Sequence, residues 1–200
     1  MSSDDPYFPQ ELASERRFTA PSLLCPLPEN WHSTDSDSTE LEVSEFIGGL
    51  VRVLQPALCV EAGAAWGQTT REIGLALTRN SHGQCVALEI DPFRAGYAAG
   101  RCHGLPVKVV VQSSMDYNPT GQVDLLFSDS AFHLRVPEFE RYRPFMRRGS
   151  IACFHDTAPL HGAGAHFPDG KDLHGKIAEL RDVNLLRLPT PRGITLLEVL

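Results

Sequence analysis

The sequence lacks the features that mark several large classes of protein. No apolar run approaches the roughly 18 residues of a membrane-spanning helix, so we expect a protein that does not span a membrane. The N-terminus is acidic and polar, whereas a signal peptide begins with basic and then apolar residues. The five cysteines contain no CxxC pair, which argues against a disulfide framework or a thiolate zinc site. These absences predict a cytoplasmic protein.

The sequence also has fewer basic than acidic residues. The chain of 200 residues has a formal net charge of −7, and its first 40 residues hold eight acidic and only two basic residues. Nucleic-acid binding needs a basic surface, so we expect no nucleic-acid partner. Five arginines between residues 135 and 148 lie at helical spacing with acids among them, and we interpret them as a solvated face. They are Arg135, Arg141, Arg143, Arg147 and Arg148.

Periodicity is absent from the first 37 residues, which contain five of the 15 prolines. We interpret residues 1–37 as an irregular arm and residues 38–200 as the folded domain. Thr39 and Glu42 have the spacing of a capping box and predict a helix that ends before Pro56. Continuous apolar runs then predict strands covered on both faces, with helices between them. The expected strands are 57–60, 85–90, 107–111, 123–127 and 150–154, and the expected helices are 69–78, 92–101 and 135–146.

The last two apolar runs, 184–188 and 194–200, are separated by only five residues. That connection is too short for a parallel crossover, so these strands should form an antiparallel pair. Together the runs predict an α/β fold. Its doubly wound, mostly parallel, seven-stranded sheet is of the Rossmann-like type and is closed by a terminal antiparallel hairpin.

Two glycines follow the first expected strand. The sequence CVEAGAAWGQTT, residues 59–70, leaves a buried strand, passes Gly63 and Gly67, and enters a helix. Glycine permits tight turns and close approach of the backbone, and a helix start offers free N–H groups to a polar ligand. Ala65 occupies the middle position of what would otherwise be GxGxxG, which disfavours a dinucleotide site. Glu89 ends the next strand, where an acid can accept both ribose hydroxyls of a nucleoside or simply face solvent.

Together these segments resemble the class I S-adenosylmethionine-dependent methyltransferases, particularly the small-molecule O-methyltransferases. That family's first motif is ExGxxxGxS/T, here EAGAAWGQT at 61–69, and its second ends in an acid, here EIDP at 89–92. The resemblance covers about residues 39–200 and implies S-adenosylmethionine as cofactor. It places the methionine portion at the glycines, the ribose at Glu89 and the adenine at residues 114–115. The implied cofactor-binding residues are Glu61, Gly63, Ala65, Gly67, Glu89, Ser114, Met115 and Asp129.

Two acids follow the fourth and fifth expected strands. Asp129 and Asp156 should meet at the ligand-binding edge of the sheet, although 27 positions separate them. Their oxygens suit a hard divalent cation such as Mg²⁺. The alternative is that both acids bind backbone groups and no metal. Related methyltransferases often read DGxH at the first position, whereas here Ser130 replaces the glycine and His133 lies one residue later. We predict Asp129 and Asp156 as metal ligands, and His133 or His155 as a neutral imidazole that accepts the proton.

These residues predict transfer of a methyl group from S-adenosylmethionine to an oxygen of a small molecule, assisted by a divalent cation. A non-catalytic S-adenosylmethionine-binding protein is the first alternative, and a nicotinamide-dependent oxidoreductase is a weaker one. A homodimer is compatible with the sequence. The glycine-rich stretch 159–170 follows the fifth strand directly, and we expect it to be a lid over the strand ends.

Overall fold

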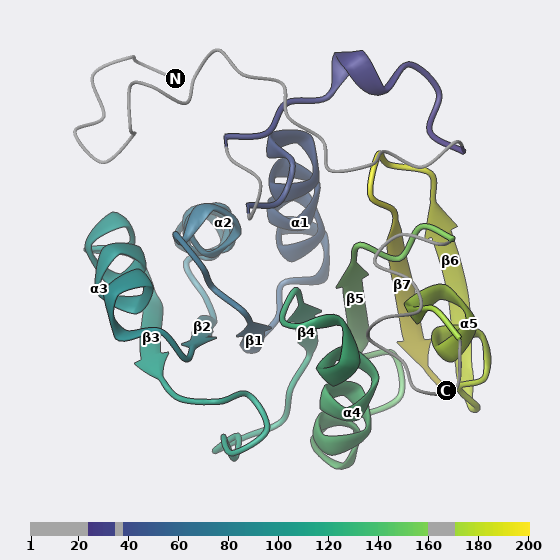
Figure 1. The fold of residues 1–200 in the computed structure, drawn as a ribbon. Helices are drawn as coiled ribbons and strands as arrows, with labels where there is room; N and C mark the ends of the chain where they lie inside the picture. Colours follow the sequence, from purple (N-terminus) through teal and green to yellow (C-terminus); the bar gives the residue numbers. More distant parts are fainter. Residues whose placement is uncertain (1–23, 35–37, 160–170) are drawn as a thin grey trace.

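The computed structural model describes residues 24–34, 38–159 and 171–200. Over these residues, seven strands form one sheet in the order β3-β2-β1-β4-β5-β7-β6 (Figure 1). The strands are β1 (Leu58–Ala62), β2 (Gln84–Glu89), β3 (Val107–Val111), β4 (Leu125–Ser128), β5 (Ile151–His155), β6 (Val183–Leu188) and β7 (Ile194–Val199). The helices are α1 (Leu41–Leu54), α2 (Gln68–Asn80), α3 (Pro92–Arg101), α4 (Phe132–Tyr142) and α5 (Leu173–Ala178).

The predicted fold class is confirmed. Strands β1 to β5 pair in parallel, and β7 pairs antiparallel with both β5 and β6. Strands β2 and β3 lie on one side of β1, and β4 and β5 lie on its other side, so the strand order reverses between β1 and β4. Val60 lies opposite Leu126 at this point. Ligands of open α/β sheets bind at such a switch point, beyond the carboxyl ends of the strands.

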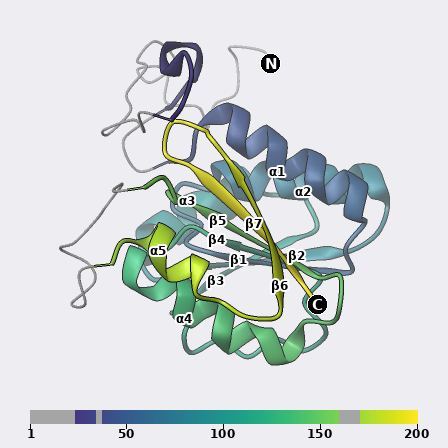
Figure 2. The same ribbon diagram turned by 90° about the vertical axis from the view of Figure 1, so that its right-hand side faces the viewer.

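Helices cover both faces of the sheet, with α1 and α2 on one face and α4 and α5 on the other (Figure 2). Successive strand residues point to opposite faces, so Cys59 packs under α1 and α2 while Val60 packs against the α4 side. All five residues of β1 are therefore buried. This double burial explains why the strands read as continuous apolar runs.

The predicted capping box at the start of α1 is wrong. Helix α1 begins at Leu41, and its N-cap residue Glu40 makes no side-chain capping bond. Thr39 instead donates from Oγ1 to Oδ2 of Asp129 at 2.8 Å, and Glu42 pairs with His32. The residues that look like a local cap are used for tertiary contacts, which spacing along the chain cannot reveal.

Two other boundaries differ from expectation. Helix α4 begins at Phe132, three residues earlier than expected, and the six-residue helix α5 was not expected, since so short a segment has no clear periodicity. Within the described part of the arm, residues 24–34 include a 3-10 turn η1 (Pro28–Asn30), and Trp31 packs against the core on the α1 side. The expected lid, apart from Pro159, lies outside the described residues, as does most of the arm. No helix among the described residues has the length and apolar character to cross a bilayer.

Candidate functional site

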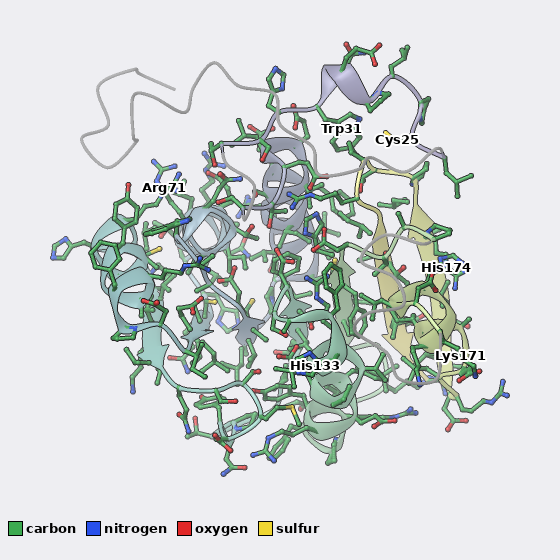
Figure 3. The ribbon with its side chains drawn as sticks, in the orientation of Figure 1. Cys25, Trp31, Arg71, His133, Lys171 and His174 are labelled. Atoms are coloured by element: carbon green, nitrogen blue, oxygen red, sulfur yellow. The ribbon has the colours of Figure 1, made fainter. Side chains whose placement is uncertain are left out.

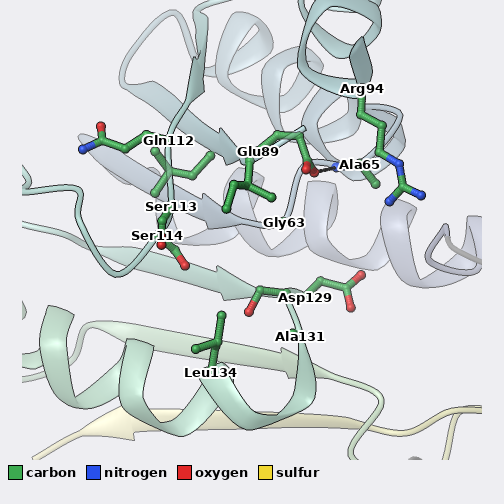
Figure 4. Close-up of a pocket in the computed structure, with 13 residues that line it drawn as sticks. Gly63, Ala65, Glu89, Arg94, Gln112, Ser113, Ser114, Asp129, Ala131 and Leu134 are labelled. Atoms are coloured by element: carbon green, nitrogen blue, oxygen red, sulfur yellow. Dashed lines mark hydrogen bonds between the residues drawn. The ribbon is translucent and has the colours of Figure 1, made fainter. Parts of the chain in front are cut away.

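A pocket lies at the carboxyl ends of β1, β2 and β4, at the switch point of the sheet (Figure 4). Five of the eight predicted cofactor residues line it, namely Gly63, Ala65, Glu89, Ser114 and Asp129. Three others do not line it, namely Glu61, Gly67 and Met115. The lining also contains residues that the sequence analysis missed, including Arg94, Gln112 and Leu134. These follow β2 and β3 or begin α4, so only the strand order brings them to one place.

The carboxylate of Glu89 is fixed at the centre of this pocket. One oxygen accepts the backbone N–H of Ala65 at 2.8 Å, and the other accepts the N–H of Asp91 at 3.0 Å. Each carboxylate oxygen can accept about two hydrogen bonds, so both oxygens keep acceptor capacity for a ligand. Glu89 is only 7% exposed. Its geometry suits a ligand that offers two neighbouring hydroxyl groups.

The glycines of the turn after β1 serve different purposes. Gly63 has φ +88°, and a Cβ atom there would lie 2.7 Å from the backbone oxygen of Asp129, so the turn packs directly on the end of β4. Gly67 has φ +76°, and a Cβ atom there would lie 2.8 Å from the Cα of Ala98 in α3. The requirement at Gly67 is thus close packing of α2 on α3 rather than contact with the pocket.

Ser114 is held by residues of α4 that the sequence analysis did not select. Its hydroxyl donates to the carboxylate of Glu138, which also accepts the hydroxyl of Ser128. The phenol of Tyr142 donates to the backbone oxygen of Ser114 at 2.7 Å. All four residues are buried. The loop after β3 is therefore tied to α4, which fixes one end of the pocket.

Glu61, another predicted cofactor residue, is enclosed by the protein. It is 1% exposed, and its Oε2 atom has no hydrogen-bond partner among the described residues. Burial raises the pKa of Glu61 to about 8; the neighbouring Thr70 hydroxyl opposes this effect, and the charges of Asp129 and Glu89 add to it. The carboxyl group is therefore mostly protonated at neutral pH.

His155 lies between carboxylates on both sides of its ring. Its Nε2 atom is 2.6 Å from Glu40 Oε2, and its Nδ1 atom is 3.1 Å from Asp129 Oδ1. Burial alone would lower the pKa of this imidazole, but Asp156, Asp129 and Glu40 raise it to about 10. For His155 this argues against the predicted neutral imidazole, because each ring nitrogen faces a carboxylate.

Arg135 lies between the two predicted metal ligands. Its Nη2 atom donates to Asp129 Oδ1 at 3.0 Å and to Asp156 Oδ2 at 2.9 Å. Its Nε atom donates to the backbone oxygen of Ser130 at 2.8 Å, and its Nη1 atom donates to the backbone oxygen of His155. Arg135 is 2% exposed, so its assignment to a solvated face is wrong. Its helical spacing placed it on the inner face of α4, toward the strand ends.

A second buried arginine, Arg192, closes the cluster from the turn before β7. Its Nη2 atom and its backbone N–H each lie 3.3 Å from an oxygen of Glu40, and its Nε atom is 3.6 Å from Asp156 Oδ1. Burial alone would raise the pKa of Glu40, but His155 and Arg192 lower it to about 2. Glu40 and Arg192 were not expected in the site. Nothing in the local sequence marks either of them as a site residue, since each is a charged residue whose burial becomes visible only in the folded chain.

The comparisons with known proteins agree with this architecture. Residues 60–157 match a family described as a methyltransferase domain. This chain has the class I methyltransferase fold. The O-methyltransferase TomG from Streptomyces achromogenes, involved in tomaymycin synthesis and solved with S-adenosylmethionine, is 20% identical, with a TM-score of 0.66 over 82% of each chain. No curated protein matches significantly.

Two further solved structures have the same methyltransferase fold. The O-methyltransferase from Bacillus cereus, in complex with S-adenosylhomocysteine, is 18% identical, with a TM-score of 0.66 over 82% of this chain and 84% of that one. The S-adenosylhomocysteine-bound methyltransferase PaMTH1 from Podospora anserina is 16% identical, with a TM-score of 0.67 over 82% and 80%. The resemblance drawn from the two sequence motifs is confirmed.

Within this methyltransferase fold, the predicted pair of metal ligands does assemble. Asp129, His155 and Asp156 place one ligand atom each within 4.8 Å of one another. A divalent cation does not fit the arrangement, because the carboxylate oxygens that face each other share the Nη2 atom of Arg135. The cluster contains three acids and three cations, so it is balanced without an ion. The acids are Glu40, Asp129 and Asp156, and the cations are Arg135, His155 and Arg192.

His133 is not part of this cluster. It lies at the first turn of α4 and is exposed, with no hydrogen bond to another described residue (Figure 3). Its neighbours Ala131 and Leu134 line the pocket. The role of His133 as a proton acceptor stays a prediction.

Proposed function

We propose that the protein transfers the methyl group of S-adenosylmethionine to an oxygen of a small molecule. The observation that carries this proposal is the carboxylate of Glu89, fixed by Ala65 and Asp91 at the switch point with acceptor capacity left for the ribose hydroxyls. Solved proteins of the same fold bind this ligand or its product, which supports the assignment. The small-molecule acceptor and the absence of a nucleic-acid partner are parts of the same proposal.

In this reaction the acceptor oxygen displaces the sulfonium sulfur from the methyl carbon. A new C–O bond forms, the C–S bond breaks, and the products are the methyl ether, S-adenosylhomocysteine and one proton. Most of the acceleration of such a displacement comes from holding three atoms in line. Glu89 contributes by fixing the ribose, and Gly63 contributes by letting the turn after β1 pack on the end of β4 at the edge of the pocket.

The proton released by the acceptor needs a group that solvent can reach. His155 is fully buried between the carboxylates of Glu40 and Asp129, which raise its pKa, whereas His133 is exposed beside the pocket. We therefore assign the proton acceptor to His133. His133→Asn should lower kcat at least tenfold while leaving the affinity for S-adenosylhomocysteine unchanged, as expected for loss of a general base. His103→Asn, at another exposed histidine, is the matched control.

The direct test of the function has two stages. Calorimetry should show that S-adenosylhomocysteine binds to the purified protein and that NADH does not. Methyl-labelled S-adenosylmethionine should then transfer label to members of a panel of phenols, hydroxy acids and sugars. Binding of NADH without binding of S-adenosylhomocysteine would replace the proposal with the oxidoreductase alternative.

A non-catalytic S-adenosylmethionine-binding protein is the second candidate. The observation that favours it is the position of Asp129, whose Oδ1 atom faces Arg135 and His155 and whose Oδ2 atom accepts the hydroxyl of Thr39. Structural contacts of this kind account for an acid at the strand end without a catalytic role. Tight binding of S-adenosylhomocysteine with no transfer to any acceptor, and no effect of His133→Asn, would favour this candidate.

The compartment is also part of the proposal. The five cysteines are buried and unpaired. Free thiols persist in a reducing compartment, which supports a cytoplasmic location.

A further inference from the structure

We propose that the guanidinium of Arg135 occupies the place of a divalent cation, so that this site is built to work without a metal. The inference concerns the same pocket as the proposed function. Its test reads metal binding rather than methyl transfer, so the two can fail separately.

The position between the two strand-end acids is already filled. A cation shared by the two strand-end acids would lie between Asp129 and Asp156, about 2.0–2.6 Å from an oxygen of each. The Nη2 atom of Arg135 already bridges these acids, at 3.0 Å from one and 2.9 Å from the other. An ion ligated by the same two oxygens would overlap this nitrogen.

Arg135 is also held in this position. Its Nε and Nη1 atoms donate to the backbone oxygens of Ser130 and His155, and its guanidinium carbon lies 4.7 Å from the centre of the Phe132 ring. Its side chain is 3% exposed. Leaving the site would break hydrogen bonds from all three nitrogens in a buried place, which is costly. A divalent ion therefore cannot displace the side chain easily.

The distribution of charge also disfavours an ion. Arg192 adds a second guanidinium, with its Nε atom 3.6 Å from Asp156 Oδ1, and guanidinium groups do not lose their proton in proteins. The other oxygen of Asp129 accepts the hydroxyl of Thr39. An entering ion would meet two fixed positive charges and an acid whose oxygens are already engaged. The chain thus keeps two acids at the strand ends but supplies their cations from its own side chains.

Arg135 is accordingly a positioning residue. It orients Asp129, which lines the pocket, and it has no need to touch the acceptor. In this arrangement the acceptor hydroxyl is oriented by hydrogen bonds from protein groups. Turnover should then persist in EDTA.

The test uses Mn²⁺ as probe and electron paramagnetic resonance as readout, with the full-length protein. The wild type should bind no Mn²⁺ at free concentrations up to about 1 mM, the weak end of the range for carboxylate sites. Arg135→Ala should acquire one Mn²⁺ site with at least tenfold higher affinity than any wild-type binding. Adding Asp156→Asn to Arg135→Ala should abolish it. Arg148→Ala, at an exposed arginine, should behave as the wild type.

The outcomes are decisive in each case. One Mn²⁺ bound to the wild type and lost in Asp156→Asn would overturn the proposal, as would a folded Arg135→Ala that gains no site. Should Arg135→Ala fold only when Mn²⁺ is present, the proposal is supported. Should it not fold at all, the wild-type titration decides, together with Arg135→Lys, which keeps the charge and should also bind no Mn²⁺. Calorimetry with S-adenosylhomocysteine reports separately on the proposed function.

Discussion

The carboxylate of Glu89 accepts a hydrogen bond from the backbone N–H of Ala65 at 2.8 Å and so ties the end of β2 to the turn after β1. Ala65 has a φ of 45°, in the left-handed region that costs a residue with a side chain about 1 kcal/mol. The bond to Glu89 helps to hold this strained turn. The group that is expected to recognise the ribose therefore also shapes the turn beside it.

Glu89→Ala should weaken binding of S-adenosylhomocysteine by about tenfold to a hundredfold, because hydrogen bonds to a charged group contribute roughly 1.5–3 kcal/mol. Isothermal titration calorimetry measures the effect. Thermal unfolding of the same variant separates loss of the ligand contact from loosening of the turn. Glu140→Ala, at an exposed acid, should leave affinity unaltered. Unchanged affinity in Glu89→Ala would remove this residue from the site.

Gly63→Ala should destabilise the protein and weaken cofactor binding together. The residue has φ +88°, and the added Cβ would lie 2.7 Å from the backbone oxygen of Asp129, so the turn and the end of β4 have to separate. Gly96→Ala is the matched control, because Gly96 lies within α3 and a Cβ there meets no atom within 4 Å. The control should be stabilised by about 0.5–1 kcal/mol, since alanine favours the helix. Equal melting temperatures for the two variants would contradict the packing argument.

The charged cluster should make stability depend on pH at both extremes. The pKa of His155 is raised from 6.5 to about 10, so its stabilising effect is complete below 6.5 and is lost as the pH rises toward 10. The pKa of Glu40 is lowered from 4.5 to about 2, so its effect is complete above 4.5 and is lost as the pH falls toward 2. Melting temperature against pH should show both declines. In His155→Gln the alkaline decline should be shallower, and an unchanged alkaline limb would show that His155 is not held as a cation.

Glu61 should also make stability fall as the pH rises, but over a lower pH range than His155. Because its pKa is raised from 4.5 to about 8, folding favours the protonated acid, and stability should fall as the pH rises from 4.5 to 8. Glu61→Gln removes this ionisation and should be more stable than the wild type at pH 8, by an amount on the order of a few kcal/mol. The two proteins should have similar stability near pH 4.5. Denaturant unfolding at both pH values measures the difference, and a variant that is less stable at both would refute the buried neutral acid.

The fold could be predicted from the sequence because each local pattern of apolar and polar residues is compatible with only one arrangement of strands and helices. Continuous apolar runs separated by helical stretches require a sheet covered on both faces, and the connection 189–193 is too short for anything but an antiparallel pair. The positions of Gly63 and Glu89 at the sheet edge follow from the same reasoning, since Gly63 comes directly after β1 and Glu89 is the last residue of β2.

The composition of the charged cluster was decided only by the tertiary structure. Glu40, Arg135 and Arg192 lie far apart in the chain, and nothing in their local sequence distinguishes them from solvated charges. Their partners are set by which helix face turns inward and by the way the β6–β7 hairpin returns along β5. The sequence by itself determined the sheet, the turn and the acid that faces the pocket, because hydrophobic pattern and chain length dictate them. Only folding decided that the acids at the strand ends meet arginines, because a charge pair depends on distance in space and not on spacing along the chain.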